Sequence, residues 1–206
     1  MSLDPDSAAP KSISASEMRH RLANLFQLLS TLTRMRIQKS ADAETKRQLT
    51  WLLEAVSALG VLQQQLIDPT GGDFAGYLTE MLPLWRRRCA GRPVQLQLIA
   101  APVILREQLA SALAVIANEL VANAILHAHP DGRAGAVTIE LEPLPDGRAA
   151  LIVRDDGVGY LPDDSDRAKL GLWLVRGLTD QVKGVMTTTV ENGVTARLEF
   201  PIGGAG

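Results

Sequence analysis

The chain has 206 residues, of which 46% are hydrophobic and 21% charged, and its formal net charge is −2. This length allows one long domain or two small ones with a real core, and the composition excludes a disordered protein. The small net charge gives no electrostatic reason to expect binding to nucleic acid. Cys89 is the single cysteine, so no disulfide can form within the chain and we expect a reducing cytoplasm.

The N-terminal part predicts a helical hairpin over residues 14–69. Residues 1–13 are a polar, proline-containing lead that does not resemble a signal peptide. Ser14 or Ser16 suits the N-cap of a helix that runs to about Lys39, with apolar residues in heptad spacing at Met18, Leu22, Leu25, Leu29 and Leu32. After the polar link 40–44, a second helix to about Ile67 carries a matching seam at Leu49, Leu52, Val56, Leu59 and Leu66.

One such hairpin cannot bury all of its apolar residues, since Phe26, Leu28, Leu53 and Leu62 lie outside the two seams. Two hairpins from two chains would bury them in a four-helix bundle. We therefore expect a homodimer that forms through the hairpin.

Beyond the turn formers at 68–73, which mark a domain boundary, the pattern changes to mixed helix and strand. The expected elements are a helix at 74–89, a strand at 94–100, a helix at 104–128, a hairpin at 136–144 and 148–156, a helix at 170–182, and a hairpin at 185–192 and 194–202. Strands paired as hairpins with helices on one face predict a two-layer α/β sandwich over 74–202, and hence an α+β chain.

The run 109–128 is nearly long enough to cross a membrane. Asn118, Glu119 and Asn123 interrupt it, and polar groups are costly in lipid. We therefore expect a buried helix of a soluble domain and no membrane segment.

Three short patterns in this second part carry chemistry. In NELVANAILHA, Glu119 and Asn123 share one helix face and offer the oxygen ligands that Mg²⁺ prefers, although a capped or solvent-facing pair explains them equally well. In VRDDGVGY, glycines let the backbone approach a ligand closely, and the Asp155 carboxylate can accept a hydrogen bond from an amino group such as that of adenine. In KLGLWLV, Gly171 opens a helix, where backbone N–H groups favour a phosphate.

In this order and at this spacing, the three patterns resemble the ATP-binding domain shared by gyrase, heat-shock chaperones, histidine kinases and MutL. The resemblance implies ATP and Mg²⁺ as cofactors. It gives Glu119 the role of polar or general-base residue beside the metal, Asn123 that of Mg²⁺ ligand, and Asp155 that of adenine reader. Gly157, Gly159 and Gly171 would shape the nucleotide pocket and its lid at about 160–169.

The hairpin adds a second resemblance, because HRLANLFQLL is similar to the HRxxNxxQ box of HWE-like bacterial histidine kinases. Glu17, His20, Asn24 and Gln27 form a polar stripe away from the apolar seam. A phosphoacceptor has to be exposed, and a nearby carboxylate can orient the imidazole. Taken alone, His20 is a solvent-facing helix residue.

Together, the two resemblances imply a cytoplasmic bacterial histidine kinase core. His20 would be phosphorylated from Mg·ATP with help from Glu17 and Asn24. The phosphoryl group would pass to an Asp of a response-regulator receiver domain.

Three departures from the family pattern keep other functions open. Leu126 stands where a lysine or arginine is usual, the second glycine box is reduced to Gly171, and the lid at about 160–169 is short. An ATP-independent histidine phosphotransferase of the ChpT type would tolerate these departures. An anti-sigma-factor serine kinase or binding module is the third alternative, because GLWLVRGLTDQV resembles that branch. His127 and His129 suit the end of the long helix electrostatically, and we assign neither a catalytic role.

Overall fold

The computed structural model describes residues 15–65, 71–159 and 170–203. The lead at 1–13 and the lid at 160–169 lie outside the described residues, as do the side chains of Met18 and His20. The helices are α1 (Ala15–Lys39), α2 (Ala43–Gln65), α3 (Phe74–Arg88), α4 (Glu107–His127) and α5 (Leu170–Gln181). The strands are β1 (Gly72–Asp73), β2 (Val94–Ala100), β3 (Ile104–Leu105), β4 (Gly135–Pro143), β5 (Arg148–Asp155), β6 (Val185–Val190) and β7 (Val194–Pro201).

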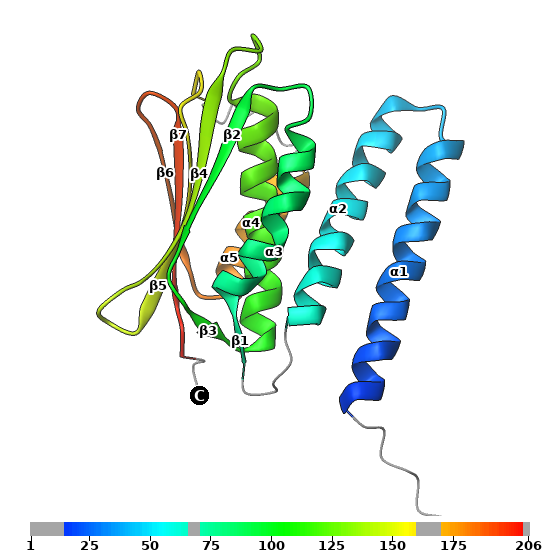
Figure 1. Cartoon of the computed structure of the whole chain (residues 1–206), viewed down its shortest axis with the longest axis horizontal. Helices are drawn as coiled ribbons and strands as arrows, with labels where there is room; N and C mark the ends of the chain where they lie inside the picture. The colour runs from blue at the N-terminus through cyan, green and yellow to red at the C-terminus, as the bar shows by residue number, and fades with distance from the viewer. Residues whose placement is uncertain (1–14, 66–70, 160–169, 204–206) are drawn as a thin grey trace, which may run out of the picture.

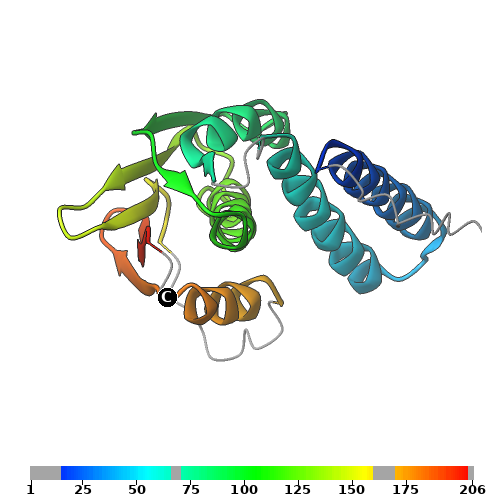
Figure 2. The same ribbon diagram turned by 90° about the horizontal axis from the view of Figure 1, so that it is seen from below.

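The predicted α+β architecture is confirmed: a helical hairpin precedes a sheet covered by helices (Figure 1). Five strands form the sheet in the order β2-β4-β5-β7-β6. The hairpins β4–β5 and β6–β7 are antiparallel as expected, whereas β2 pairs with β4 in parallel. Figure 2 places α3, α4 and α5 on the same face of this sheet, which makes the two layers.

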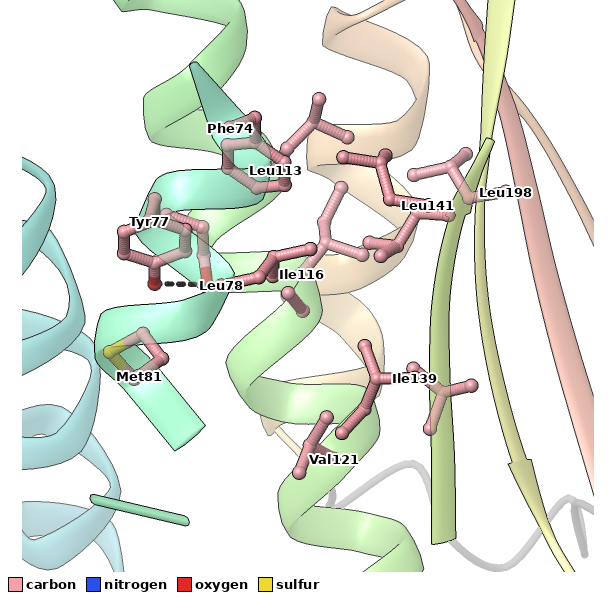
Figure 3. Close-up of a cluster of buried hydrophobic side chains, with 14 of the residues drawn as sticks. Phe74, Tyr77, Leu78, Met81, Leu113, Ile116, Val121, Ile139, Leu141 and Leu198 are labelled. Carbon is pink, nitrogen blue, oxygen red and sulfur yellow. Dashed lines mark hydrogen bonds between the residues drawn. The ribbon is translucent and has the colours of Figure 1, made fainter. Parts of the chain in front are cut away.

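The core fills the space between these layers, with α4 at its centre (Figure 3). Leu113 and Ile116 of α4 are fully buried, and Leu141 and Leu198 meet them from the sheet. From α3, the stacked rings of Phe74 and Tyr77 and the side chains of Leu78 and Met81 close the layer. Burial of large apolar side chains at about 25 cal/mol per Å² is the main force that holds the sheet and helices together.

The long apolar run is α4, as expected, and it is a core helix. It is long and apolar enough to cross a membrane, but 78% of its most apolar window is buried inside the protein. Trp85 Nε1 donates to Asn118 Oδ1 over 3.2 Å, which satisfies one of the polar groups that the run contains. α4 begins at Glu107 rather than at the expected residue 104, because Ile104 and Leu105 pair with β1 instead.

The hairpin divides its apolar residues differently from the expectation. Of the predicted seam residues of α1, Leu22 is half-buried, while Leu25, Leu29 and Leu32 are about half exposed. Phe26 and Ile37, which lie outside that seam, are half-buried. From α2, Ala58 and Leu62 are buried in the core, and α2 packs against α3 and α4. One side of the hairpin therefore joins the following domain, and the other side presents leucines outward.

Candidate nucleotide-binding site

A mostly apolar pocket lies between the C-terminal half of α4 and the sheet. It brings together Asn123 from α4 and Asp155 and Gly159 from the end of β5 and the turn that follows it, three of the residues expected at a nucleotide pocket. Its other described lining residues are Leu120, Ala124, His127, Ala128, Val153, Leu172, Thr188, Val194 and Ala196. A pocket of this kind, with apolar walls and a few polar groups, suits a flat base.

Asp155 ends β5 and is held in place by the turn that follows it. Its Oδ1 accepts hydrogen bonds from the backbone N–H groups of Gly157 at 2.9 Å and Val194 at 3.2 Å. The side chain is buried, and its second oxygen has no partner among the residues that the structure describes. A carboxylate oxygen without a partner in the wall of a pocket is an acceptor for an amino group on a ligand.

Two glycines allow neighbouring chain segments to approach closely around Asp155. A Cβ on Gly157 would collide with the Ala128 carbonyl oxygen at the end of α4. Gly193, which lies between the two strands of the last predicted hairpin, has a φ of +124° and leaves room for the Asp155 carbonyl oxygen. The close approach of these three segments requires glycine, so Gly193 belongs to the site although its own sequence signal indicates only a hairpin.

Glu119 lies one turn before Asn123, but it is absent from the described lining of the pocket. Its side chain is 3% exposed and faces the junction of α4 with α2 and α5. A Cβ on Gly171 would collide with Glu119 Oε2 and would lie 3.3 Å from Trp51 Nε1. Gly171 therefore lets the start of α5 pack against this carboxyl group.

Burial raises the pKa of Glu119 to about 7, and the nearby Glu54 carboxylate adds to this effect. The Trp51 indole N–H and the Arg88 guanidinium act in the opposite direction. Trp51 Nε1 and Glu119 Oε1 still lack a hydrogen-bond partner with good geometry among the described residues. Beside them, Arg88 pairs with Glu54 at 3.1 Å, so a polar cluster joins the hairpin to the domain that follows it.

We expect Glu119→Gln to stabilise the nucleotide-free and magnesium-free protein at about pH 8 and to have no effect near pH 4. The folded state holds a proton on Glu119 that the unfolded chain has released, so stability falls as pH rises from 4.5 to about 7. A pKa shift of this size lowers the free energy of unfolding of the wild type by on the order of 3 kcal/mol between the acidic and the alkaline end of this range. Urea unfolding at both pH values measures this difference, with the exposed Glu80→Gln as the control. Parallel pH profiles for wild type and Glu119→Gln would contradict the expectation.

The hairpin residues lie far from the pocket. His20 belongs to α1 by its backbone, and Glu17 and Asn24 on the same helix have exposed side chains. The N-terminal end of α1 and the C-terminal end of α4 lie at opposite ends of the molecule (Figure 1). The structure thus brings Asn123, Asp155 and Gly159 together, but not with His20.

Three residues that follow Asn123 lie at or just beyond the end of α4. His127 lines the pocket one turn after Asn123. The i+4 spacing of the two residues in the sequence already puts them on the same helix face. Leu126 points to solvent and is 48% exposed. We expected His129 to end the long helix, but it lies beyond the end of α4 and is buried beside Asp156.

Residues 92–198 match the family of histidine kinase-like ATPase domains, which is just over half of the chain. This chain belongs to that family. The matched range contains all three polar patterns of the second part of the chain, so the ATPase domain is the part that holds the pocket.

Longer relatives extend the match to the hairpin. Sensor histidine kinase PdtaS of Mycobacterium tuberculosis is 29% identical over 211 residues, which cover 95% of this chain and 41% of that protein. Blue-light-activated histidine kinase 2 of Erythrobacter litoralis is 26% identical over 213 residues, covering 96% of this chain and 60% of that protein. The chain therefore spans between two fifths and three fifths of the length of these two relatives.

The fold itself occurs in solved structures. The histidine kinase domain of the Erythrobacter litoralis EL346 blue-light activated histidine kinase superposes with a TM-score of 0.71 at 19% identity. The superposition covers 90% of this chain and 94% of that one. The two chains therefore share one fold.

Proposed function

We propose that this chain is the core of a bacterial histidine protein kinase that phosphorylates His20 from ATP. The observation that carries the proposal is that Asn123 and Asp155 line one apolar pocket in a chain whose first helix holds His20. Two relatives that cover almost the whole chain are named histidine kinases, which supports the same activity. As in two-component systems generally, the acceptor of the phosphoryl group would be an Asp of a response-regulator receiver domain.

In this proposal the pocket holds the adenine base. The free oxygen of Asp155 accepts a hydrogen bond from the adenine amino group, while Val153 and Ala196 pack against the ring. Asn123, which lines the pocket with a half-buried amide, would hold Mg²⁺. The ion would neutralise phosphate charge, and it keeps several water and phosphate ligands of its own. In the described part of the chain, no group of three or more His, Cys, Asp or Glu could hold a metal ion. An ion bound mainly by Asn123, water and phosphate oxygens needs no such group.

For the transfer, an imidazole nitrogen of His20 attacks the γ-phosphorus. A P–N bond forms, the bond from phosphorus to the β,γ-bridging oxygen breaks, and ADP leaves with that electron pair. The imidazole releases its proton to Glu17 or to water. Glu17 is exposed on the same helix and accepts a hydrogen bond from Arg21 at 2.8 Å, which places its carboxylate on this face.

His20 belongs to the N-terminal part of α1, and the pocket is lined by the C-terminal part of α4, two ends that lie at opposite ends of the molecule (Figure 1). For transfer to His20 of the same chain, the hairpin therefore has to move relative to the ATPase domain. That movement would separate Trp51 from Glu119 and break the Glu54–Arg88 pair. Glu119 would then be free to turn toward Asn123. We propose that Glu119 joins the magnesium site only in this second arrangement.

Incubation of the protein with γ-labelled ATP and Mg²⁺ tests the proposal. We expect acid-labile, base-stable label on the chain, and its transfer to a receiver domain added afterwards. Absence of ATP binding, with label gained at His20 from a phosphorylated receiver, would indicate the ATP-independent phosphotransferase instead. Label on a serine of a partner protein would indicate the anti-sigma-factor kinase.

We also propose that the chain is a homodimer. The exposed apolar side chains of the hairpin would pack against a second copy, and they are Leu25, Leu28, Leu29, Leu32, Met35 and Leu52.

We expect the double variant Leu25→Glu, Leu29→Glu to be monomeric. Each buried leucine contributes about 1.5–3 kcal/mol, so its loss in two copies weakens association by more than about 100-fold. Light scattering across a concentration series measures the mass. Arg34→Glu adds an acidic side chain to the opposite side of α1 and should leave the dimer intact. A wild-type protein that is already monomeric would contradict the dimer.

A further inference from the structure

Just beyond α4, a buried histidine meets the turn that follows Asp155. His129 is 4% exposed, and its Nε2 lies 2.8 Å from Asp156 Oδ1. Because a carboxylate only accepts, Nε2 carries the proton of this bond. The same Oδ1 also accepts from the backbone N–H of Ala136 at 2.8 Å. The Ala136 N–H and His129 together hold the pKa of Asp156 below its usual range, against the effect of burial.

This pair is one of several bonds between the end of α4 and the turn after β5. The Val158 N–H donates to the Ala128 carbonyl at 2.9 Å, and Arg133 Nη2 donates to the Asp156 carbonyl at 2.7 Å. The residues on either side of these bonds line the pocket: His127 and Ala128 on one wall, Asp155 and Gly159 on the other. The bonds therefore fix the distance between two walls of the nucleotide pocket.

The site is built around the imidazole. A Cβ on Gly135 would overlap the His129 ring, so glycine there makes the room that the ring occupies. His129 Nδ1 is buried without a partner among the described residues, which costs free energy that an apolar ring would not. An imidazole at this position donates a hydrogen bond to Asp156, which an apolar side chain could not do.

We infer that His129 is a positioning residue, which acts through Asp156 to hold the 155–159 turn against the end of α4 in the geometry that binds the nucleotide. The identity of the nucleotide as ATP rests on the proposed function. His129 does not touch the nucleotide in this inference. Its loss therefore weakens binding and leaves the transfer step from bound ATP unchanged.

The initial rate of autophosphorylation over a range of ATP concentrations tests the inference, with kcat taken as the limiting rate constant of the single transfer to His20. We expect His129→Phe, which keeps the ring volume, to raise KM for ATP by about tenfold with kcat within about twofold of wild type. His129→Gln places an amide N–H near the position of Nε2 and should restore most of the affinity. Asp156→Ala, a change at an exposed side chain, should resemble His129→Phe, and the double variant should be no worse than either. Asp146→Asn in the distant β4–β5 turn is the control.

Additive effects of the two variants, or a lower kcat at unchanged KM, would overturn the inference. Amide hydrogen exchange at Val158 provides a readout that needs no activity. We expect faster exchange in His129→Phe and in Asp156→Ala than in wild type, and unchanged exchange would also overturn the inference. If the wild type neither binds ATP nor becomes labelled, the proposed function fails, while the exchange measurement still tests the His129–Asp156 tie.

Discussion

His20→Gln is expected to abolish autophosphorylation while leaving ATP binding unchanged. Glutamine keeps the helix and a polar side chain but offers no nucleophilic nitrogen, so labelling falls by more than roughly 1,000-fold. The described lining of the pocket contains no residue of α1, so the Kd for ATP should be that of the wild type. Labelling with γ-labelled ATP and calorimetric titration measure the two quantities separately.

Gln38→Ala, at an exposed position near the other end of α1, is the matched control and should be labelled like the wild type. Glu17→Gln should slow labelling by about 10- to 100-fold, because it removes a proton acceptor and not the nucleophile. Full labelling of His20→Gln would place the phosphoacceptor elsewhere. In that case the HRLAN pattern would be an ordinary solvated helix face.

Much of the fold follows from local patterns. The alternation of VQLQLIA predicts β2 at Val94–Ala100, and the turn residues after Pro143 predict the β4–β5 hairpin. The parallel pairing of β2 with β4 was not predicted, because it depends on how α4 returns the chain across the sheet. The pair β1–β3 was also missed, since two-residue strands leave no periodicity to detect.

The candidate site likewise contains residues that a local motif predicts and contacts that only the fold brings about. Asp155, Gly157 and Gly159 alternate with other residues in one short motif, and a motif of this kind predicts its own turn. Gly193 and the Trp51–Glu119 contact arise where distant segments meet, so nothing near them in the sequence indicates a role. The expected partnership of Glu119 with Asn123 followed from helix spacing alone. Helix spacing cannot tell that α2 and α5 enclose the carboxyl group in this arrangement.

Asp155→Asn is expected to weaken ATP binding by about 100-fold, because it removes a charged acceptor at a buried position. The asparagine carbonyl can still accept from the backbone N–H groups of Gly157 and Val194, so the turn keeps its shape. The side-chain NH₂ then faces the adenine amino group, and two donors meet. Titration with ATP measures the loss, and Asp180→Asn, on the exposed face of α5, controls for the change of charge.

The same substitution should shift base preference, and this outcome separates recognition from loss of folding. Guanine carries an oxygen where adenine carries its amino group, so an asparagine NH₂ can donate to it. We therefore expect the ratio of the Kd for GTP to the Kd for ATP to fall by more than about tenfold in Asp155→Asn. A variant that is folded by circular dichroism and binds both nucleotides as the wild type does would show that Asp155 does not read the base. Equal weakening for ATP and GTP would assign Asp155 to the shape of the turn alone.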